Sequence, residues 1–285
     1  MILQSDAILE NSIILLLSRQ FNLSASDIQK KIHHTGKQYS LQGIYKGLQK
    51  LQISGIVIKE KQFYSLRLPW VMDFIALADV MAETYIESGA TFFSLPERGE
   101  RMIWRFKNVL RMNEFWSHIL LILVQKSADK TLFGWNPHLW FHFAQTAQEE
   151  QYIKALKLAH SKLYLIIGGD TYLDRWAEKY LKIGNVEYVY GNDHLEKDQS
   201  KYINIIDDYV LTIKLDEKSA QLVNALYDNT TSLEGANLQD LLQIFHMKAN
   251  IKFWLENNPS KALQYRKKFS RFFGIKEIKT HKRAA

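Results

Sequence analysis

The sequence contains no cysteine, and this absence removes several kinds of chemistry from consideration. Disulfide bonds, metal sites built on thiolates and cysteine nucleophiles are all excluded. A chain without cysteine fits a reducing compartment, so we expect a cytoplasmic protein.

The sequence also lacks an apolar run of membrane-spanning length near its start. The run SIILLL at 12–17 is too short to cross a bilayer, and an acidic start stands where a signal peptide has its basic region. We therefore expect no membrane partner. The apolar and charged fractions, 47% and 24%, are those of a globular protein, and 285 residues suffice for about two domains.

Positive charge is concentrated at the two ends of the chain. Residues 1–68 hold nine Lys and Arg against four Asp and Glu, and residues 261–285 hold nine against one. The remaining residues are acidic in balance although the whole chain is +7. This uneven distribution favours a polyanionic partner at one end or both. The C-terminal segment 261–285 is equally compatible with a solvated terminus.

The first 68 residues show three short helical patterns followed by a hairpin pattern. The third helix is predicted over 40–53, with Ser40 as its N-cap, Leu41, Ile44, Leu48 and Leu51 facing inward, and Gly55 ending it. β-branched and aromatic residues on both sides of Lys59-Glu60-Lys61 predict the hairpin. Three helices and a hairpin in this order describe a winged helix-turn-helix, whose third helix can enter the major groove of DNA.

The outward residues around this third helix have the side chains expected of a DNA contact. Gln side chains can bond base edges, Tyr offers a hydroxyl with apolar area, and Lys can meet phosphates. The predicted DNA-binding residues are Lys37, Gln38, Tyr39, Ser40, Gln42, Tyr45, Lys46, Gln49 and Lys50, with Lys59 and Lys61 on the hairpin wing. The alternative is a winged helix that binds protein.

The stretch YSLQGIYKGLQKLQISGIVIKEKQFYSL resembles the recognition helix and wing of winged-helix transcription regulators, in particular the TrmB-type and PadR-type. The likeness covers residues 6–68. The later segments LYLIIGGDTYLDRWAEKYLK and KYINIIDDYVLTIKL, with Phe253-Trp254 in a closing helix, resemble the phospholipase-D-like effector domain of TrmB-type regulators. This second resemblance implies a domain in which small ligands tune DNA binding.

Beyond residue 68 we expect a mixed α/β chain with three regions in all. Residues 1–68 form the winged helix, 69–142 a helical connector that mediates dimerisation through a very apolar helix at 70–87, and 143–285 an α/β effector-like domain. The pattern predicts helix over 100–126 and 238–257, and strands in KLYLIIGG, NVEYVYG, KYINIID and YVLTIKL.

A phospholipase-D-like fold would be catalytic only with a complete His-x-Lys motif and its later Asp. His-x-Lys occurs at His160–Lys162 and at His246–Lys248, but Ile167 and Phe253 occupy the places that need Asp. The sequence therefore predicts no catalytic residues and no cofactor. A divergent phosphodiesterase or nuclease and a non-enzymatic adaptor are the alternatives to a regulator.

The aromatic segment around residue 138 offers a weak ligand pocket. Trp135, His138, Trp140 and His142 combine aromatic rings with polar groups, as apolar ligand pockets do. His138 and His142, four residues apart, could share a helical face and a zinc ion, but aromatic core packing is the simpler interpretation, and we predict no metal. Gly168-Gly169-Asp170 could bind an anion or form a tight turn capped by Asp170, and Asp207-Asp208 could hold a cation or form a turn.

The leading hypothesis is a sequence-specific regulator that binds double-stranded DNA as a homodimer and responds to a small-molecule effector.

Overall fold

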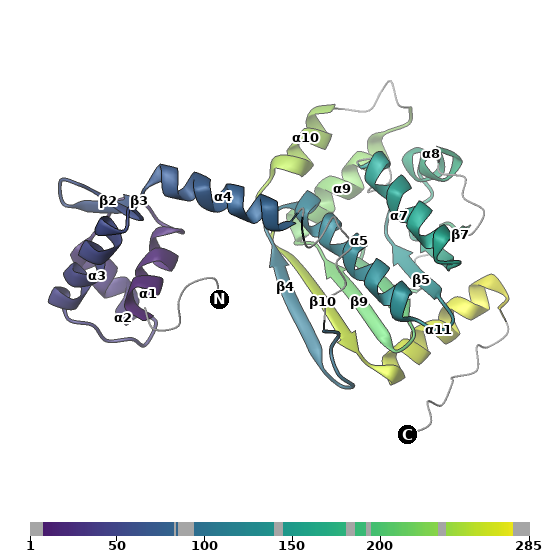
Figure 1. Cartoon of the computed structure of the whole chain (residues 1–285). Helices are drawn as coiled ribbons and strands as arrows, with labels where there is room; N and C mark the ends of the chain where they lie inside the picture. Colours follow the sequence, from purple (N-terminus) through teal and green to yellow (C-terminus); the bar gives the residue numbers. More distant parts are fainter. Residues whose placement is uncertain are drawn as a thin grey trace. The chain divides into compact units, whose positions relative to one another are not determined.

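The computed structural model describes residues 8–82, 84, 94–139, 145–180, 186–191, 195–232 and 238–275. The chain divides into two compact units, Met1–Ser88 and Gly89–Ala285 (Figure 1). The division falls inside the segment 69–142 that the sequence analysis treats as one helical connector. The units are described separately below.

The first unit has the predicted order of three helices and a hairpin. Its elements are α1 (Ile8–Leu17), β1 (Leu23–Ser24), α2 (Ala25–His33), α3 (Leu41–Ile53), β2 (Val57–Glu60), β3 (Phe63–Leu66) and α4 (Leu68–Ala82). The strand order β1-β3-β2 adds one short strand to the hairpin. This arrangement is a winged helix-turn-helix.

Local capping fixes where the helices of the first unit begin. Ser24 and Asp27 form a reciprocal capping box at the start of α2, and the Ser40 hydroxyl accepts a hydrogen bond from the Gly43 amide at the start of α3. Gly36 and Gly55 take positive φ values of 84° and 71°, which allow the chain to turn after α2 and α3. The caps therefore fix the residue at which each helix begins, and with it which side chains of α3 face the core and which face solvent.

The core of the first unit holds α3 against α1 and α2. Ile13, Ile28, Ile44 and Leu48 are fully buried. Burial of each such side chain contributes about 1.5–3 kcal/mol relative to exposure. Leu41, predicted to face inward, is instead 39% exposed because it stands in the first turn of α3, outside the packed stripe.

The second unit is built on one seven-stranded sheet with strand order β4-β10-β9-β8-β5-β6-β7. Its strands are β4 (Arg101–Phe106), β5 (Thr131–Asn136), β6 (Lys162–Ile167), β7 (Val186–Val189), β8 (Lys201–Ile206), β9 (Tyr209–Lys214) and β10 (Ile251–Asn257). Strands β5, β6 and β7 are parallel to one another, and the other pairs are antiparallel. Mixed α/β architecture, as predicted, is confirmed.

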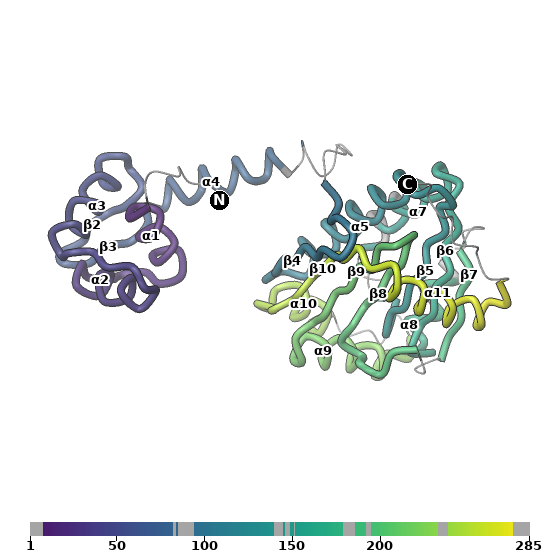
Figure 2. Tube along the Cα trace, turned by 90° about the horizontal axis from the view of Figure 1, so that it is seen from below, coloured from purple at the N-terminus to yellow at the C-terminus, as the bar shows by residue number. Residues whose placement is uncertain are grey.

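Helices cover the two faces of this sheet unequally. The helices are α5 (Val109–Lys126), α7 (Thr146–Leu158), α8 (Tyr172–Tyr180), α9 (Glu217–Asn229), α10 (Leu238–His246) and α11 (Pro259–Phe273). The larger core joins one face to α5, α7, α8, α9 and α10. On the other face α11 packs on β6, β8 and β9, with Phe269 fully buried, and Figure 2 shows this yellow helix crossing β8.

Two predicted helices are each part strand. The segment 100–126 contains β4 before α5, and 238–257 contains α10 followed by β10. These two strands pair with each other, Ile251 opposite Phe106 and Glu256 opposite Arg101, so a contact between distant segments overrides the local helical pattern. Because β4 and β5 belong to the sheet, the second half of the predicted connector is part of the α/β unit.

Candidate nucleic-acid interface and ligand cavity

One face of α3 is polar and fully presented to solvent. Gln42, Tyr45, Lys46 and Gln49 are exposed and follow the i, i+3, i+4, i+7 spacing of a single helix face. The opposite face carries Ile44, Leu48 and Leu51 into the core. The capped start and the packed inner face therefore hold the outer polar side chains on a rigid element, as groove readout requires.

Lys46 and Lys50 have different electrostatic surroundings. The Lys50 ammonium lies 3.0 Å from the Glu10 carboxylate of α1. Burial alone would raise the pKa of Glu10, but its backbone hydrogen bond and the bond from Lys50 outweigh this effect and lower the pKa. Among the described residues Lys46 has no carboxylate within ion-pair distance, so its charge is the more available for a phosphate.

The four predicted residues that precede α3 are partly used in holding the helix. The Ser40 hydroxyl caps α3, and the half-buried Tyr39 packs against the core while its carbonyl accepts a 2.9 Å hydrogen bond from Gln29. Lys37 and Gln38 are exposed, with Lys37 donating to Ser12 at 3.2 Å. Contact between these residues and DNA stays a prediction, and Tyr39 and Ser40 have structural roles in addition.

The wing presents its two lysines as expected. Lys61 occupies the turn between β2 and β3 with φ at 55°, a conformation uncommon for a residue with a Cβ atom. Lys59 lies opposite Tyr64 in the hairpin, and its ammonium stands 5.6 Å from the centre of that ring. Both lysines are exposed, so the wing adds positive charge beyond α3.

Of the two predicted pocket residues that the structure describes, His138 lines a cavity and Trp135 does not. Trp140 and His142 lie outside the described residues. Trp135 is fully buried in the core beneath α11, whereas His138 lines a cavity on the other face of the sheet. His138 follows the end of β5 in irregular structure, and the predicted spacing to His142 extends beyond the described residues.

The cavity lies between α5, α7 and the sheet, is open to solvent and has a volume of about 40 Å³. Its side chains are Asn113, Trp116, Ser117, Leu120, Asn136, His138, Leu139, Glu149, Tyr152, Leu163, Leu165 and Asn204. Among the residues that the structure describes, the buried Asn136 Oδ1 and Tyr152 hydroxyl have no hydrogen-bond partner. Burial raises the pKa of Tyr152 well above its usual value, and the nearby Glu149 charge adds to this effect. Buried polar atoms of this kind usually have a partner, so the cavity has the character of a ligand site.

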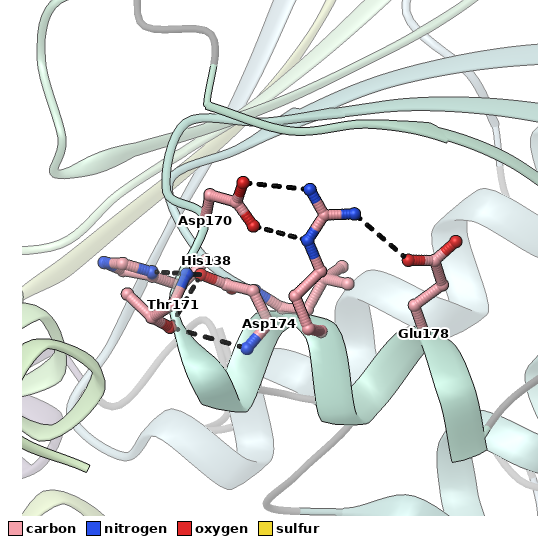
Figure 3. Close-up of polar contacts among 7 residues, drawn as sticks. His138, Asp170, Thr171, Asp174 and Glu178 are labelled. Atoms are coloured by element: carbon pink, nitrogen blue, oxygen red, sulfur yellow. Dashed lines mark hydrogen bonds and ion pairs between the residues drawn. The ribbon is translucent and has the colours of Figure 1, made fainter. Parts of the chain in front are cut away.

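His138 is held rigidly at the edge of this cavity (Figure 3). Its Nδ1 atom lies 3.0 Å from Oδ2 of the fully buried Asp174, and its ring stacks on Tyr227 with centroids 4.3 Å apart. Asp174 also accepts bonds from the Leu139 amide and the Thr171 hydroxyl, both at 2.9 Å. The contact with Asp174 uses Nδ1 of the imidazole, so Nε2 takes no part in it.

The two His-x-Lys sequences are not brought together. His160 and His246 are both exposed, in the turn before β6 and at the end of α10. Strands β6 and β10, which follow them, lie four strand spacings apart, about 19 Å. Ile167 and Phe253, in the places of the missing Asp, are fully buried.

Two acidic or glycine-rich turns have structural explanations. The Gly168 and Gly169 amides donate to the carbonyls of Asn136 and Pro137, so they are not directed at an anion. Thr171, and not Asp170 as predicted, directly precedes α8, while Asp170 pairs with Arg175, which lowers the Asp170 pKa. Asp207 and Asp208 form the turn between β8 and β9. No cluster of three or more metal-ligating side chains occurs in the part of the chain that the structure describes.

Comparison with known proteins gives fold-level likeness alone. No family model matches the chain. No curated protein matches it either. The archaeal chromatin protein TrmBL2, which binds DNA, aligns with 94% of this chain and 93% of its own at 12% identity and a TM-score of 0.36.

Two further solved structures align with part of the chain. NucT from Helicobacter pylori aligns with 61% of this chain and 97% of its own, at 10% identity and a TM-score of 0.36. Nuc from Salmonella typhimurium, a phospholipase D family member, aligns with 61% and 95%, at 9% identity and a TM-score of 0.35. No described helix has the length and apolar character that crossing a membrane requires.

The cavity groups Asn136 and Tyr152 were missed by the sequence analysis. Asn136 ends β5, which runs parallel to β6, and polar residues at the carboxyl end of a parallel strand are a recognised signal for a binding site. Tyr152 carries no such signal, because its position in α7 resembles that of any core aromatic.

Proposed function

We propose that this chain is a DNA-binding transcriptional regulator of TrmB-like organisation, a winged helix followed by an α/β unit. The observation that carries the proposal is the exposed polar face of α3, formed by Gln42, Tyr45, Lys46 and Gln49 on a helix whose other face is fully packed. Gln and Tyr offer hydrogen bonds to base edges, and the lysines of α3 and the wing offer charge to phosphates.

The proposed complex places α3 in the major groove and the wing on the flanking backbone. Lys46 and the wing residues Lys59 and Lys61 then supply most of the salt-dependent affinity, because each phosphate contact releases a counterion. Gln42 and Gln49 supply sequence preference, since an amide can bond two atoms of an adenine edge.

Helix α4 supports binding as a homodimer. Its apolar side chains are unusually exposed: Leu68 is 69%, Met72 54% and Ile75 47% accessible, and these three form one stripe along the helix. Exposed apolar stripes of this kind mark interaction surfaces. A second copy packed on this stripe gives a twofold arrangement of two α3 helices, which favours a near-palindromic operator.

The cavity of the second unit is the proposed effector site. Asn136 and Tyr152, which have no partner among the described residues, and His138, fixed by Asp174, offer hydrogen bonds to a small polar molecule. The exposed His-x-Lys residues do not converge on this cavity, which favours a sensing role over phosphodiester chemistry.

Selection of bound duplexes from a random pool, followed by titration at several salt concentrations, tests the DNA-reading proposal. Lys46→Ala with Lys50→Ala should lower affinity and reduce the salt slope by up to about two, and Gln42→Ala with Gln49→Ala should relax the selected sequence. Lys154→Ala with Lys218→Ala, at exposed positions of α7 and α9, is the charge-matched control. An unchanged affinity and slope in the double lysine variant rejects the proposal.

A further inference from the structure

Four basic residues form one straight row across four neighbouring strands of the large sheet. Arg105 of β4 pairs with Lys252 of β10, Lys252 pairs with Lys214 of β9, and Lys214 pairs with Lys201 of β8. Directly paired residues point to the same face, so the four side chains stand next to one another, and we call them the basic row. Figure 1 shows β4, β10 and β9 lying side by side.

Only half of this row is neutralised within the chain. Lys214 and Lys201 share Asp198, at 3.1 and 3.5 Å, and Lys201 also reaches Glu196 at 3.3 Å. Burial would raise the pKa of Asp198, but the bonds from Ser200 and Lys214 dominate and lower it, so its charge persists. Arg105 and Lys252 have no carboxylate within ion-pair distance among the residues the structure describes.

Like charges placed directly opposite each other destabilise a sheet, so folding alone does not favour this row. Protection of an edge strand explains a basic residue on β4, which is at the edge. It does not explain Lys252 and Lys214, because β10 and β9 are interior strands. Binding of an external anion would offset the repulsion between the side chains of the row.

The surface beside the row also carries accessible apolar groups. Ile103 is 47% exposed, and the half-buried Trp254 lies opposite it, with the Lys252 ammonium 5.3 Å from the centre of its ring. The carboxylate of Glu256, next on this face, is already paired with Arg101 and Lys261. Positive charge with an aromatic group on an accessible surface is the composition of a nucleic-acid contact.

We propose that the basic row is a second DNA-binding surface, which holds the phosphate backbone of double-stranded DNA without reading its bases. Three strand spacings give the row a length of about 14 Å, over which a duplex carries about eight phosphate charges. In the proposed complex Arg105 and Lys252 contact phosphates directly. Lys214 and Lys201 are paired with Asp198 in the free chain, so they contact phosphates only to the extent that they give up this pairing. The inference rests on the proposed function only in taking DNA as the polyanion.

The test is a duplex titration with the full chain carrying Arg105→Gln and Lys252→Gln. Affinity for a labelled duplex of mixed sequence should fall about tenfold at low salt, and the salt slope should fall by about two. Thermal stability should stay equal or rise, because two repelling charges leave the sheet. A loss of DNA affinity without a loss of thermal stability distinguishes a binding role of the row from a structural role.

The matched control carries Lys154→Gln and Lys218→Gln, which remove the same charge from exposed positions of α7 and α9. Equal affinity and slope in the row variant and this control overturn the proposal. Each pair is also made in the Lys46→Ala, Lys50→Ala background. If the row variant loses DNA binding and the α3 variant does not, the basic row stands and the winged-helix proposal fails. If the α3 variant loses DNA binding and the row variant does not, the winged-helix proposal stands and the basic row fails.

Discussion

The Lys50 ammonium of α3 lies 3.0 Å from the Glu10 carboxylate of α1, so one of the cations nearest the proposed DNA-reading face is already paired within the protein. Lys46, one turn earlier on the same helix, is not held in this way. The pair joins α1 to α3 at the surface, where an ion pair contributes at most about 1 kcal/mol to stability. Its larger effect is on how much positive charge α3 offers to DNA.

Glu10→Gln should therefore strengthen DNA binding. Loss of the carboxylate frees Lys50 for a phosphate, so affinity should rise several-fold at low salt and the salt slope should steepen by up to about one. In the complementary experiment Lys46→Ala should weaken binding more than Lys50→Ala. Fluorescence anisotropy titrations measure both. Equal losses in the two lysine variants contradict this assignment.

A substitution in the wing turn should change the stability of the chain and its DNA affinity in opposite directions. Lys61 has φ at 55°, which disfavours any residue with a Cβ atom, so Lys61→Gly should raise the free energy of unfolding by about 0.5–1 kcal/mol. The same change removes a predicted phosphate contact and should lower DNA affinity. Urea unfolding and duplex titration measure the two effects. Gln62→Gly, beside it without a positive φ, should only destabilise.

The exposed stripe on α4 predicts a dimer that one charge can disrupt. Ile75→Glu should shift the chain toward monomer in sedimentation experiments, because a charge would enter the apolar contact, while folding is preserved at this exposed position. Leu77→Glu, exposed on the opposite side of α4, is the control and should leave the dimer unchanged. A wild-type chain that sediments as a monomer at all concentrations contradicts the assignment.

Tyr152→Phe should reveal the cavity as a ligand site. The change removes a buried hydroxyl that has no partner in the described part of the chain, so the free energy of unfolding should stay equal or rise by about 1 kcal/mol. Small polar compounds that raise the melting temperature of the wild-type chain should raise that of the variant less. Tyr172→Phe, at an exposed position of α8, is the matched control. A marked loss of stability in Tyr152→Phe contradicts the unpartnered state of the hydroxyl.

Asp198 predicts an acid-sensitive contribution to stability. Hydrogen bonds from Ser200 and Lys214 hold the pKa of the folded state below that of the unfolded state, despite an opposing effect of burial. The stabilisation is thus present above about pH 4 and is lost as pH falls through the lower, folded value. Asp198→Asn should lower the melting temperature at neutral pH, and the two curves should converge in acid. A constant difference at all pH values contradicts the prediction.

The first unit was predictable because its signals are local. Ser24 and Ser40 cap helices within three residues, Gly55 ends α3, and the spacing of Ile44, Leu48 and Leu51 alone defines which face of α3 is buried. The exposed Gln, Tyr and Lys side chains follow directly from that face. The ion pair from Lys50 to Glu10, in contrast, depends on how α1 and α3 meet.

The second unit depended on pairing between distant segments. Nothing within 101–106 or 251–257 decides strand over helix, since both are rich in residues that suit either state. Each became a strand because the other lay beside it, and the same pairing aligned Arg105 with Lys252. Tertiary structure likewise set Asp174 against His138 and left Asn136 and Tyr152 facing a cavity, since these contacts join residues 16 or more positions apart. The sequence by itself determined the reading helix, its caps and its charge; the sheet register, the basic row and the cavity were decided by contacts that no local pattern encodes.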